Sequence, residues 1–253
     1  MKREERRQAI MDLLVQMGAV DLDDLAQRFD VSKMTIHRDL DDLENLGLLR
    51  KIRGGATIES GTQFEADYRY RALQNVDVKR AVADKAASLI EPGMTVLIND
   101  GTTAGLMADA IVNIRPLTVI TNNLAAINTL TDVQGVNLIA LGGTYSRKFN
   151  GFFGMMTEES LSRLQVDLAF LSTPAVNGLT CYHMDESVTR CKRAMIEAGA
   201  KVVLLADGKK FGRTALHQLS DMTAFDTVVT LDLDIQHAAP LREAGIEILN
   251  AKD

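Results

Sequence analysis

The chain has 253 residues, of which 46% are apolar and 25% are charged, values that exclude a fully disordered protein. The formal charge of -6 argues against a protein that coats nucleic acid by bulk charge. The two cysteines, Cys181 and Cys191, fit neither a disulfide framework nor a paired-cysteine zinc site. No targeting segment or membrane-spanning run is visible, so we expect a soluble cytoplasmic protein without a metal centre.

Residues 1–57 predict a small domain of three amphipathic helices. Apolar residues recur at helical spacing along three stripes, which are Ile10, Leu13, Leu14 and Met17, then Leu22, Leu25, Ala26 and Phe29, then Ile36, Leu40 and Leu43. Gly18 and Gly47 are expected to end the first and third helices. Asp21 and Ser32 are expected to cap the second and third.

A two-stranded ribbon is predicted directly after the third helix. Between Leu48 and Ile52, leucine and isoleucine are interspersed with basic residues, and Gly54 and Gly55 then allow a turn. Three helices and a ribbon could form only a packing module. The placement of the side chains favours a DNA-binding role instead.

The outer face of the third helix suits DNA. Met34, Arg38, Asp41 and Asn45 point away from the apolar stripe, and His37 lies at its flank. An arginine on this face can pair with guanine in the major groove. At the start of the helix, Ser32, Lys33 and Thr35 are placed to hold a phosphate.

Charge in residues 1–57 is segregated. Basic residues form two clusters, namely Lys2, Arg3, Arg6 and Arg7, and then Arg50, Lys51 and Arg53. The acidic residues are expected largely on the second helix and on the solvent side of the third. We interpret the basic clusters as an electrostatic footprint for DNA.

These segments resemble the DeoR family of bacterial transcriptional regulators. Residues 31–40, with the sequence VSKMTIHRDL, look like the helix-turn-helix signature of that family, and residues 46–56 look like its wing. The family commonly has arginine where this chain has His37, which is either a weaker phosphate contact or a solvated residue. The resemblance implies DNA-binding roles for Ser32, Lys33, Met34, Thr35, His37, Arg38, Arg50, Lys51 and Arg53.

Residues 58–75 predict a linker and residues 76–253 an α/β domain. Candidate strands are 95–99, 118–121, 137–141, 168–172, 201–206, 227–231 and 247–249. Candidate helices are 77–90, 103–113, 123–131, 156–163, 186–199 and 240–244. This alternation predicts a mostly parallel sheet covered on both faces, with ligands beyond the carboxyl ends of its strands.

Three polar motifs fall at these strand ends. They are residues 99–103 (NDGTT), 121–123 (TNN) and 141–144 (LGGT). Each could be an ordinary turn or helix cap, yet all three meet at one predicted sheet edge. Helix-end N–H groups and hydroxyls can hold an anion, and Asp100 and Asn122 can bind sugar hydroxyls.

The resemblance extends to the family's sensor domain, over about 64–232, and implies a fold similar to the ribose-5-phosphate isomerase and CoA-transferase group. It implies effector-binding roles for Asp100, Gly101, Thr102, Thr103, Thr121, Asn122, Gly142, Gly143, Glu186, Lys192, Asp207 and Lys210. Departures from the family pattern occur at Ser172, Arg190 and Lys209. The lysines could also be solvated residues.

We therefore expect a DNA-binding repressor of a carbohydrate-catabolism operon, not an enzyme. The resemblance implies three partners: double-stranded operator DNA, a phosphorylated sugar effector and further copies of the chain, as a dimer or tetramer. No other cofactor is expected. An active sugar-phosphate isomerase using Asp100, Asp207 and Lys210 is the main alternative, and a constitutive DNA-binding scaffold is a weaker one.

Overall fold

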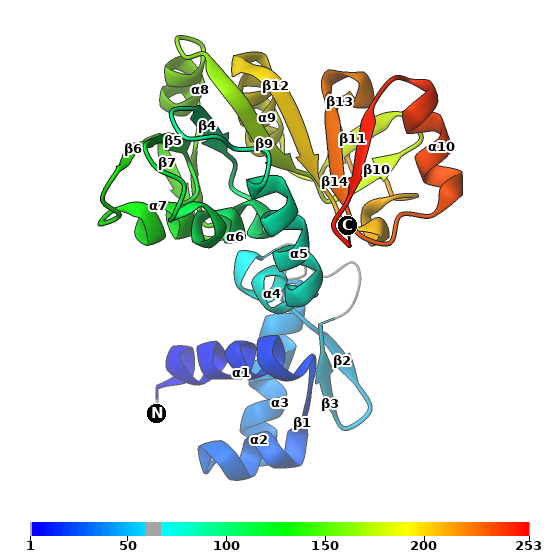
Figure 1. Ribbon diagram of the computed structural model, residues 1–253. Helices are drawn as coiled ribbons and strands as arrows, with labels where there is room; N and C mark the ends of the chain where they lie inside the picture. Colours follow the sequence, from blue (N-terminus) through cyan, green and yellow to red (C-terminus); the bar gives the residue numbers. More distant parts are fainter. Residues whose placement is uncertain (1, 59–66, 253) are drawn as a thin grey trace. The chain divides into compact units, whose positions relative to one another are not determined.

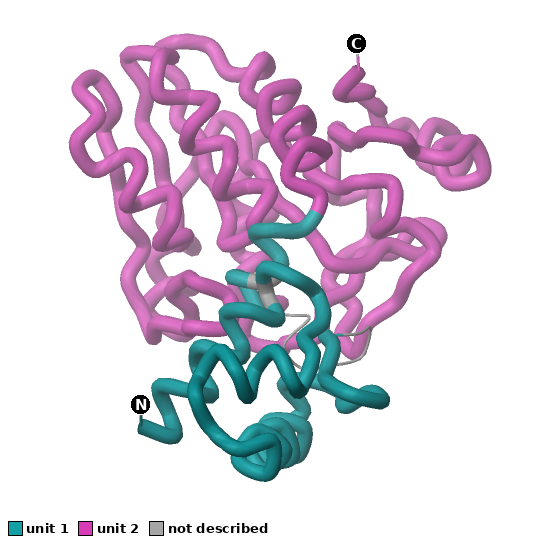
Figure 2. The backbone as a smooth tube through the Cα atoms, turned by 90° about the horizontal axis from the view of Figure 1, so that it is seen from below, with its two compact units in different colours: residues 1–74 teal, residues 75–253 magenta. Residues whose placement is uncertain are grey.

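The computed structural model describes residues 2–58 and 67–252. The chain divides into two compact units, Met1–Gln74 and Asn75–Asp253, which are coloured separately in Figure 2. The polar stretch from 59 to 63, which carries the linker prediction, lies outside the described residues.

The first unit contains the three predicted helices. They are α1 (Arg3–Met17), α2 (Leu22–Phe29) and α3 (Lys33–Asn45). The predicted caps are present: the Asp21 carboxylate accepts hydrogen bonds from the first turn of α2, and the Ser32 hydroxyl accepts one from Thr35. The predicted ribbon, β2 (Arg50–Ile52) and β3 (Gly55–Thr57), gains a third strand, β1 (Ala19–Asp21), in the order β1-β3-β2.

The core of the first unit agrees with the predicted stripes except in α1. Ile10, Leu14, Ile36 and Leu40 are fully buried. Met17 was expected in the core, but it is 65% exposed. The helix ends at Gly18, whose positive φ of 76° turns the chain into β1, so Met17 is the last residue of α1 and lies beyond the buried Leu14.

Part of the predicted linker is helical. Helix α4 (Tyr68–Leu73) begins at Asp67, whose carboxylate accepts the Arg69 amide. Arg69 Nη1 lies 3.9 Å from the Asp12 carboxylate on α1. Residues 67–73 therefore belong to the first unit rather than to a structureless connection, and the sequence reading missed this helix.

The second unit is built on a parallel sheet of seven strands, in the order β15-β14-β12-β9-β4-β5-β6 (Figure 1). The strands are β4 (Thr95–Ile98), β5 (Leu117–Thr121), β6 (Val136–Ala140), β9 (Val166–Ser172), β12 (Gly199–Leu205), β14 (Thr227–Thr230) and β15 (Glu247–Asn250). All seven predicted strands are present, which confirms an α/β fold with a parallel sheet.

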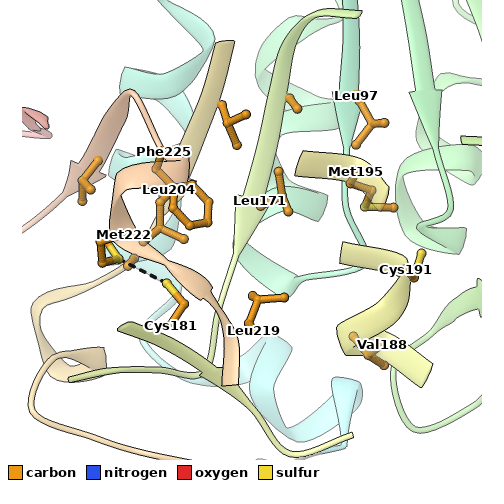
Figure 3. Close-up of a cluster of buried hydrophobic side chains, with 14 of the residues drawn as sticks. Leu97, Leu171, Cys181, Val188, Cys191, Met195, Leu204, Leu219, Met222 and Phe225 are labelled. Atoms are coloured by element: carbon orange, nitrogen blue, oxygen red, sulfur yellow. Dashed lines mark hydrogen bonds between the residues drawn. The ribbon is translucent and has the colours of Figure 1, made fainter. Parts of the chain in front are cut away.

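Helices cover both faces of this sheet. One apolar core contains side chains of α5 (Val76–Ala87), α6 (Thr102–Ile111) and α7 (Leu124–Leu130). The other contains side chains of α8 (Met155–Leu161), α9 (Glu186–Ala198) and α10 (Ile235–Glu243). Figure 3 shows this second core, where Cys191 and Met195 of α9 lie near Leu97 and Leu171 of the sheet. Helix α10 begins before the predicted range 240–244, and Pro240 lies within it.

Short antiparallel elements were not predicted. A three-stranded sheet has the order β10-β11-β13 and contains β10 (Ala175–Asn177), β11 (Thr180–His183) and β13 (His217–Asp221). A hairpin joins β7 (Thr144–Ser146) to β8 (Gly151–Phe153). Two 3-10 turns, η2 (Gly208–Lys210) and η3 (Met222–Ala224), complete the unit.

The strand order has a reversal point between β4 and β9. From β4 the chain adds β5 and β6 in one direction, and then β9, β12, β14 and β15 in the other. In open parallel sheets, ligands bind in the crevice beyond the carboxyl ends of the strands at such a point. Among the described residues, no helix is both long and apolar enough to cross a membrane.

Candidate functional site

The predicted DNA face lies on the exposed side of α3. Ser32 caps this helix, and its hydroxyl lies 2.9 Å from the Thr35 hydroxyl. Lys33, Met34, His37 and Arg38 are exposed, Met34 to 62%. The opposite side of the helix carries the buried Ile36 and Leu40, so the core fixes which side chains face solvent.

The basic cluster at the start of the chain was predicted to face DNA, but its arginines pair with acidic residues of α3. Arg6 is buried, and its Nε lies 2.6 Å from the Asp39 carboxylate, which is 1% exposed. Arg3 and Arg7 both contact the Asp42 carboxylate. Asp39 is therefore not on the solvent side of α3. These arginines pair with acidic residues of α3. An arginine that is already paired is less available to DNA.

The wing has one basic side chain in an ion pair and two exposed ones. Lys51 Nζ lies 2.5 Å from Asp41 Oδ1, and the Lys51 amide donates to the Glu44 carboxylate at 2.7 Å. These contacts hold β2 against the end of α3. Arg50 is exposed on β2, and Arg53 is exposed in the turn beside Gly54. Arg53 is therefore better placed than Lys51 for a phosphate.

In the second unit, Asn99 joins the two strands at the reversal point. Asn99 follows β4 and is fully buried. Its Oδ1 accepts hydrogen bonds from the amides of Gly101 and Ser172, each at 3.3 Å. Ser172 is the last residue of β9, so these bonds tie the ends of the two strands together.

The neighbouring Ser172 side chain explains why residue 101 is a glycine. A Cβ at this position would overlap Ser172 Oγ, so any other residue here would displace the serine side chain. Gly101 is also the N-cap of α6, and no side chain caps that helix end. The first amides of α6, which belong to Thr102 and Thr103, are therefore available to an anion.

Asp100 and Lys192 form a buried pair within this group. Lys192 Nζ lies 3.7 Å from Asp100 Oδ1 and donates to the Ser172 carbonyl at 2.7 Å. The two side chains are each 2% exposed. Asp100 Oδ1 is buried and accepts no hydrogen bond within the described part of the chain. A buried acceptor without a donor is costly unless a ligand or water supplies one.

The end of β5 supplies a second such acceptor. Asn122 is fully buried, and its Nδ2 donates to the Phe152 carbonyl at 2.9 Å. Asn122 Oδ1 accepts no hydrogen bond from the described residues. A Cβ on Gly151 would lie 3.2 Å from Asp100 Cβ and 3.0 Å from the Asn122 carbonyl oxygen. The β7-β8 hairpin therefore packs on Asp100 and Asn122, which brings these two predicted residues together.

The Thr121 hydroxyl is used in hydrogen bonds with the local backbone. It donates to the Ile98 carbonyl at 2.6 Å and accepts the Asn123 amide at 3.0 Å. Asn123 donates to the carbonyls of Asn99 and Gly101. Thr121 and Asn123 therefore connect the end of β5 to the end of β4.

Five predicted effector residues have other surroundings. Gly143 packs on Phe153 and Thr157, and the Gly142 carbonyl accepts the Thr157 hydroxyl at 2.6 Å. Glu186 is exposed and pairs with Arg190 one helical turn away. Asp207 caps η2, and the half-buried Lys210 lies in that turn. None of these contacts is with Asp100, Asn122 or Lys192.

Three further residues belong to this site, namely the buried Asn99 and Cys191 and the half-buried Ser172. Asn99 was part of the predicted NDGTT motif but was not among the predicted effector-binding residues, and Ser172 was noted as a departure from the family pattern. Cys191, whose Sγ lies 3.8 Å from Asn122 Nδ2, was considered in the sequence only as a disulfide or zinc candidate. Burial raises the pKa of the Cys191 thiol, and the nearby carboxylate of Asp100 raises it further, so this thiol stays neutral.

Comparison with known families matches both units. Residues 6–62 match the DeoR-like helix-turn-helix domain, and residues 74–232 match the DeoR C terminal sensor domain. The second match alone covers more than half of the chain. The two matched segments contain the predicted DNA-binding residues of α3 and the wing and all of the predicted effector-binding residues.

Relatives align along nearly the whole chain. A putative aga operon transcriptional repressor of Escherichia coli O157:H7 is 32% identical over 97% of this chain and 93% of its own. An L-fucose operon activator of Haemophilus influenzae is 33% identical over 88% of this chain and 90% of its own. A solved ribose 5-phosphate isomerase A from Neisseria gonorrhoeae covers 53% of this chain and 52% of its own, with 15% identity and a TM-score of 0.39.

Proposed function

Because the chain belongs to the DeoR family of transcriptional regulators, we propose that it represses a carbohydrate operon and is controlled by a phosphorylated sugar. Double-stranded operator DNA is the proposed partner of α3 and the wing, which implies a cytoplasmic location. One relative is described as a repressor and another as an activator, so the experiment below measures the sign of regulation.

The observation that carries the proposal is the buried polar group at the reversal point of the sheet. Asp100 and Asn122 each have a buried oxygen that accepts no hydrogen bond from residues 2–58 or 67–252, and no side chain in those ranges caps the start of α6. Sugar hydroxyls would donate to the two oxygens, and a phosphate would accept from the helix end. No further cofactor is proposed.

A sensor role accounts for this group better than isomerase chemistry. An acid–base catalyst must reach the substrate proton, directly or through one water. Here the Lys192 ammonium is already engaged by the Ser172 carbonyl and the Asp100 carboxylate. Asp207, the other candidate acid, caps a turn. The chain also carries a DNA-binding unit, which a metabolic enzyme does not need.

Recognition of DNA by one helix covers only a half-site, so we propose that the chain acts as a homo-oligomer, either a dimer or a tetramer. The effector would then change the affinity for operator DNA by binding two states of this assembly unequally. The difference between its affinities for the two states limits the size of that change.

The test combines ligand screening with DNA binding by the full chain. Thermal unfolding is measured with a panel of sugar phosphates and the matching unphosphorylated sugars, and any stabilising compound is added to a fluorescence anisotropy titration of the chain's own promoter fragment. We expect a phosphorylated compound to raise Tm and to weaken DNA binding. Stronger binding would indicate an activator or co-repressor mode. Promoter affinity that is unchanged by saturating ligand would overturn the proposal.

A matched pair of variants locates the ligand. Asp100→Asn removes the charge of a buried carboxylate in the site, whereas Asp132→Asn removes one from an exposed turn. The thermal shift should be lost in Asp100→Asn and retained in Asp132→Asn. Turnover of any sugar phosphate by the wild-type chain, lost in Asp100→Asn, would support the isomerase alternative instead.

A further inference from the structure

The two edges of the seven-stranded sheet differ in charge. Strand β15 forms one edge and β6 the other (Figure 1). Edge β15 contains Glu247 and is followed by Lys252, which pairs with Asp232 at 2.5 Å. Edge β6 is different, because no charged residue occurs anywhere from Val133 to Ser146. Natural sheets usually protect an open edge with charge, proline, a bulge or a covering segment.

Strand β6 also has an open face. Val136 and Leu138 pack toward the core beneath α5, α6 and α7. Asn137 and Ile139 alternate with them and so point to the other face, yet Asn137 is exposed and Ile139 is 38% exposed. Within the described part of the chain, β6 pairs only with β5. Its second side therefore presents backbone N–H and C=O groups without a strand partner.

Apolar side chains of α8 extend this surface. Leu141 is buried in the same core as Leu161 of α8, so Ile139, two residues earlier on the strand, faces the side of the sheet that carries α8. Met155 and Met156, at the start of that helix, are 78% and 68% exposed. Met156 and Gly142 line one pocket together with Ser160 and the Glu159–Arg163 ion pair, which places this methionine close to the end of β6 and the paired charges beside it.

We propose that this surface, formed by β6 with Met155 and Met156 and here named the β6 edge, pairs with the β6 edge of a second copy of the chain. The occupant must offer an uncharged strand and an apolar surface, and β6 itself offers both. Antiparallel pairing about Leu138 would set Ile139 opposite Asn137 of the second copy and join two sheets through one two-fold interface. The methionines would add the apolar area that a single strand pair lacks.

The assembly itself can be tested without DNA or effector, whereas its consequence for DNA rests on the proposed function. Ile139→Lys puts a charge on the β6 edge. Ile235→Lys makes the same substitution at an isoleucine that is 71% exposed on α10, and serves as the matched control. Light scattering after size exclusion should give a dimer or a larger even-numbered assembly for the wild type and Ile235→Lys, and half that mass for Ile139→Lys. A monomeric wild type, or an unchanged mass in Ile139→Lys, would overturn the proposal.

A second variant keeps the test valid if Ile139→Lys does not fold. In Asn137→Cys/Ile139→Cys, the proposed pairing brings each new thiol opposite one of the second copy. Cys181 and Cys191 are fully buried, so they should not compete. Mild oxidation should give a covalent dimer, and Ile235→Cys should give none. Absence of cross-linking in an assembled double variant would overturn the proposal.

DNA binding separates this inference from the proposed function. Loss of pairing should weaken binding to a fragment with two half-sites by about 100-fold and leave binding to one half-site nearly unchanged. The thermal shift given by a phosphorylated sugar should persist in Ile139→Lys. If Ile139→Lys halves the mass but no phosphorylated sugar changes Tm, the β6 interface is supported and the sensor proposal is overturned.

Discussion

The two functional regions place their polar side chains in opposite environments. On α3, Lys33 and Arg38 are exposed and rest on an apolar core. At the reversal point of the sheet, the side chains of Asp100 and Lys192 are each 2% exposed, and Asn122 is fully buried. A surface that meets DNA needs accessible donors, whereas a surface that encloses a small ligand needs donors and acceptors already free of water. Accessibility therefore distinguishes the two tasks within one chain.

Exposure also sets what each contact contributes to stability. Exposed ion pairs contribute about 0–1 kcal/mol, whereas removal of one partner from a buried pair costs about 3–5 kcal/mol. The Arg6–Asp39 pair resembles the buried Asp100–Lys192 pair in this respect, although it lies in the first unit. The following predictions test the distinction, beginning with the largest effect.

Arg6→Leu should destabilise the first unit by about 3 kcal/mol, because it leaves the buried Asp39 carboxylate without its nearest partner. Hydrogen exchange of the α3 amides in the full chain reports the stability of this unit separately. The matched change Lys33→Leu loses only the exposed pair with Asp23 and should cost less than about 1 kcal/mol. Equal costs for the two variants would contradict the distinction.

Gly101→Ala should destabilise the second unit by about 1–3 kcal/mol, because the new methyl group overlaps Ser172 Oγ. Urea unfolding measures the cost. The double change Gly101→Ala/Ser172→Gly removes the overlapping hydroxymethyl group and should recover most of the loss. If the double variant is as unstable as the single one, Ser172 is not the reason for the glycine.

Arg38→Ala should cost about 1–3 kcal/mol of discrimination between the operator and altered sequences. Arg53→Ala should weaken binding to all DNA sequences alike. It should also reduce, by about one, the slope of the logarithm of the binding constant against the logarithm of the salt concentration. Anisotropy titrations at several salt concentrations distinguish these two effects. Lys51→Ala should have a smaller effect on the salt slope than Arg53→Ala, because Asp41 already engages its ammonium. A uniform loss across sequences for Arg38→Ala would assign that arginine to the phosphate backbone.

The smallest expected effect is on thiol chemistry. Burial raises the pKa of Cys181 to about 12 and also raises that of Cys191. Both thiols are therefore neutral at pH 8 and should not react with iodoacetamide in the native chain, since the thiolate is the nucleophile. Mass spectrometry before and after urea unfolding checks this. Rapid labelling of Cys191 in the folded chain would show that the site opens to solvent.

The parallel sheet was predictable because each of its strands is a short apolar run flanked by turn residues. The antiparallel strands were not, since β7, β8 and β10 have three residues each and no buried run marks them. Helix α4 was missed for a similar reason, because its six residues are too few for a clear stripe.

The exposed DNA face followed from helical periodicity, which distinguishes Arg38 from Ile36 and Leu40 without any tertiary information. Pairing across the fold could not be foreseen in this way. Arg6 and Asp39 are 33 residues apart, and nothing in the local pattern shows that they meet. Asp100 and Asn122 were found because ligands bind beyond the carboxyl ends of parallel strands. The same expectation could not show that a larger residue at position 101 would overlap the Ser172 side chain.

The bonds between Asn99 and Ser172 have a consequence for synthesis of the chain. They join residues 73 positions apart, so this polar group is complete only after β9 and the helix that carries Lys192 have been made. A product that stops before residue 172 would retain every residue of α3 and the wing, but lack the Lys192 end of the site. If such a product bound promoters, no metabolite could release it there, so premature termination in this gene would be expected to cause unregulated occupancy rather than simple loss.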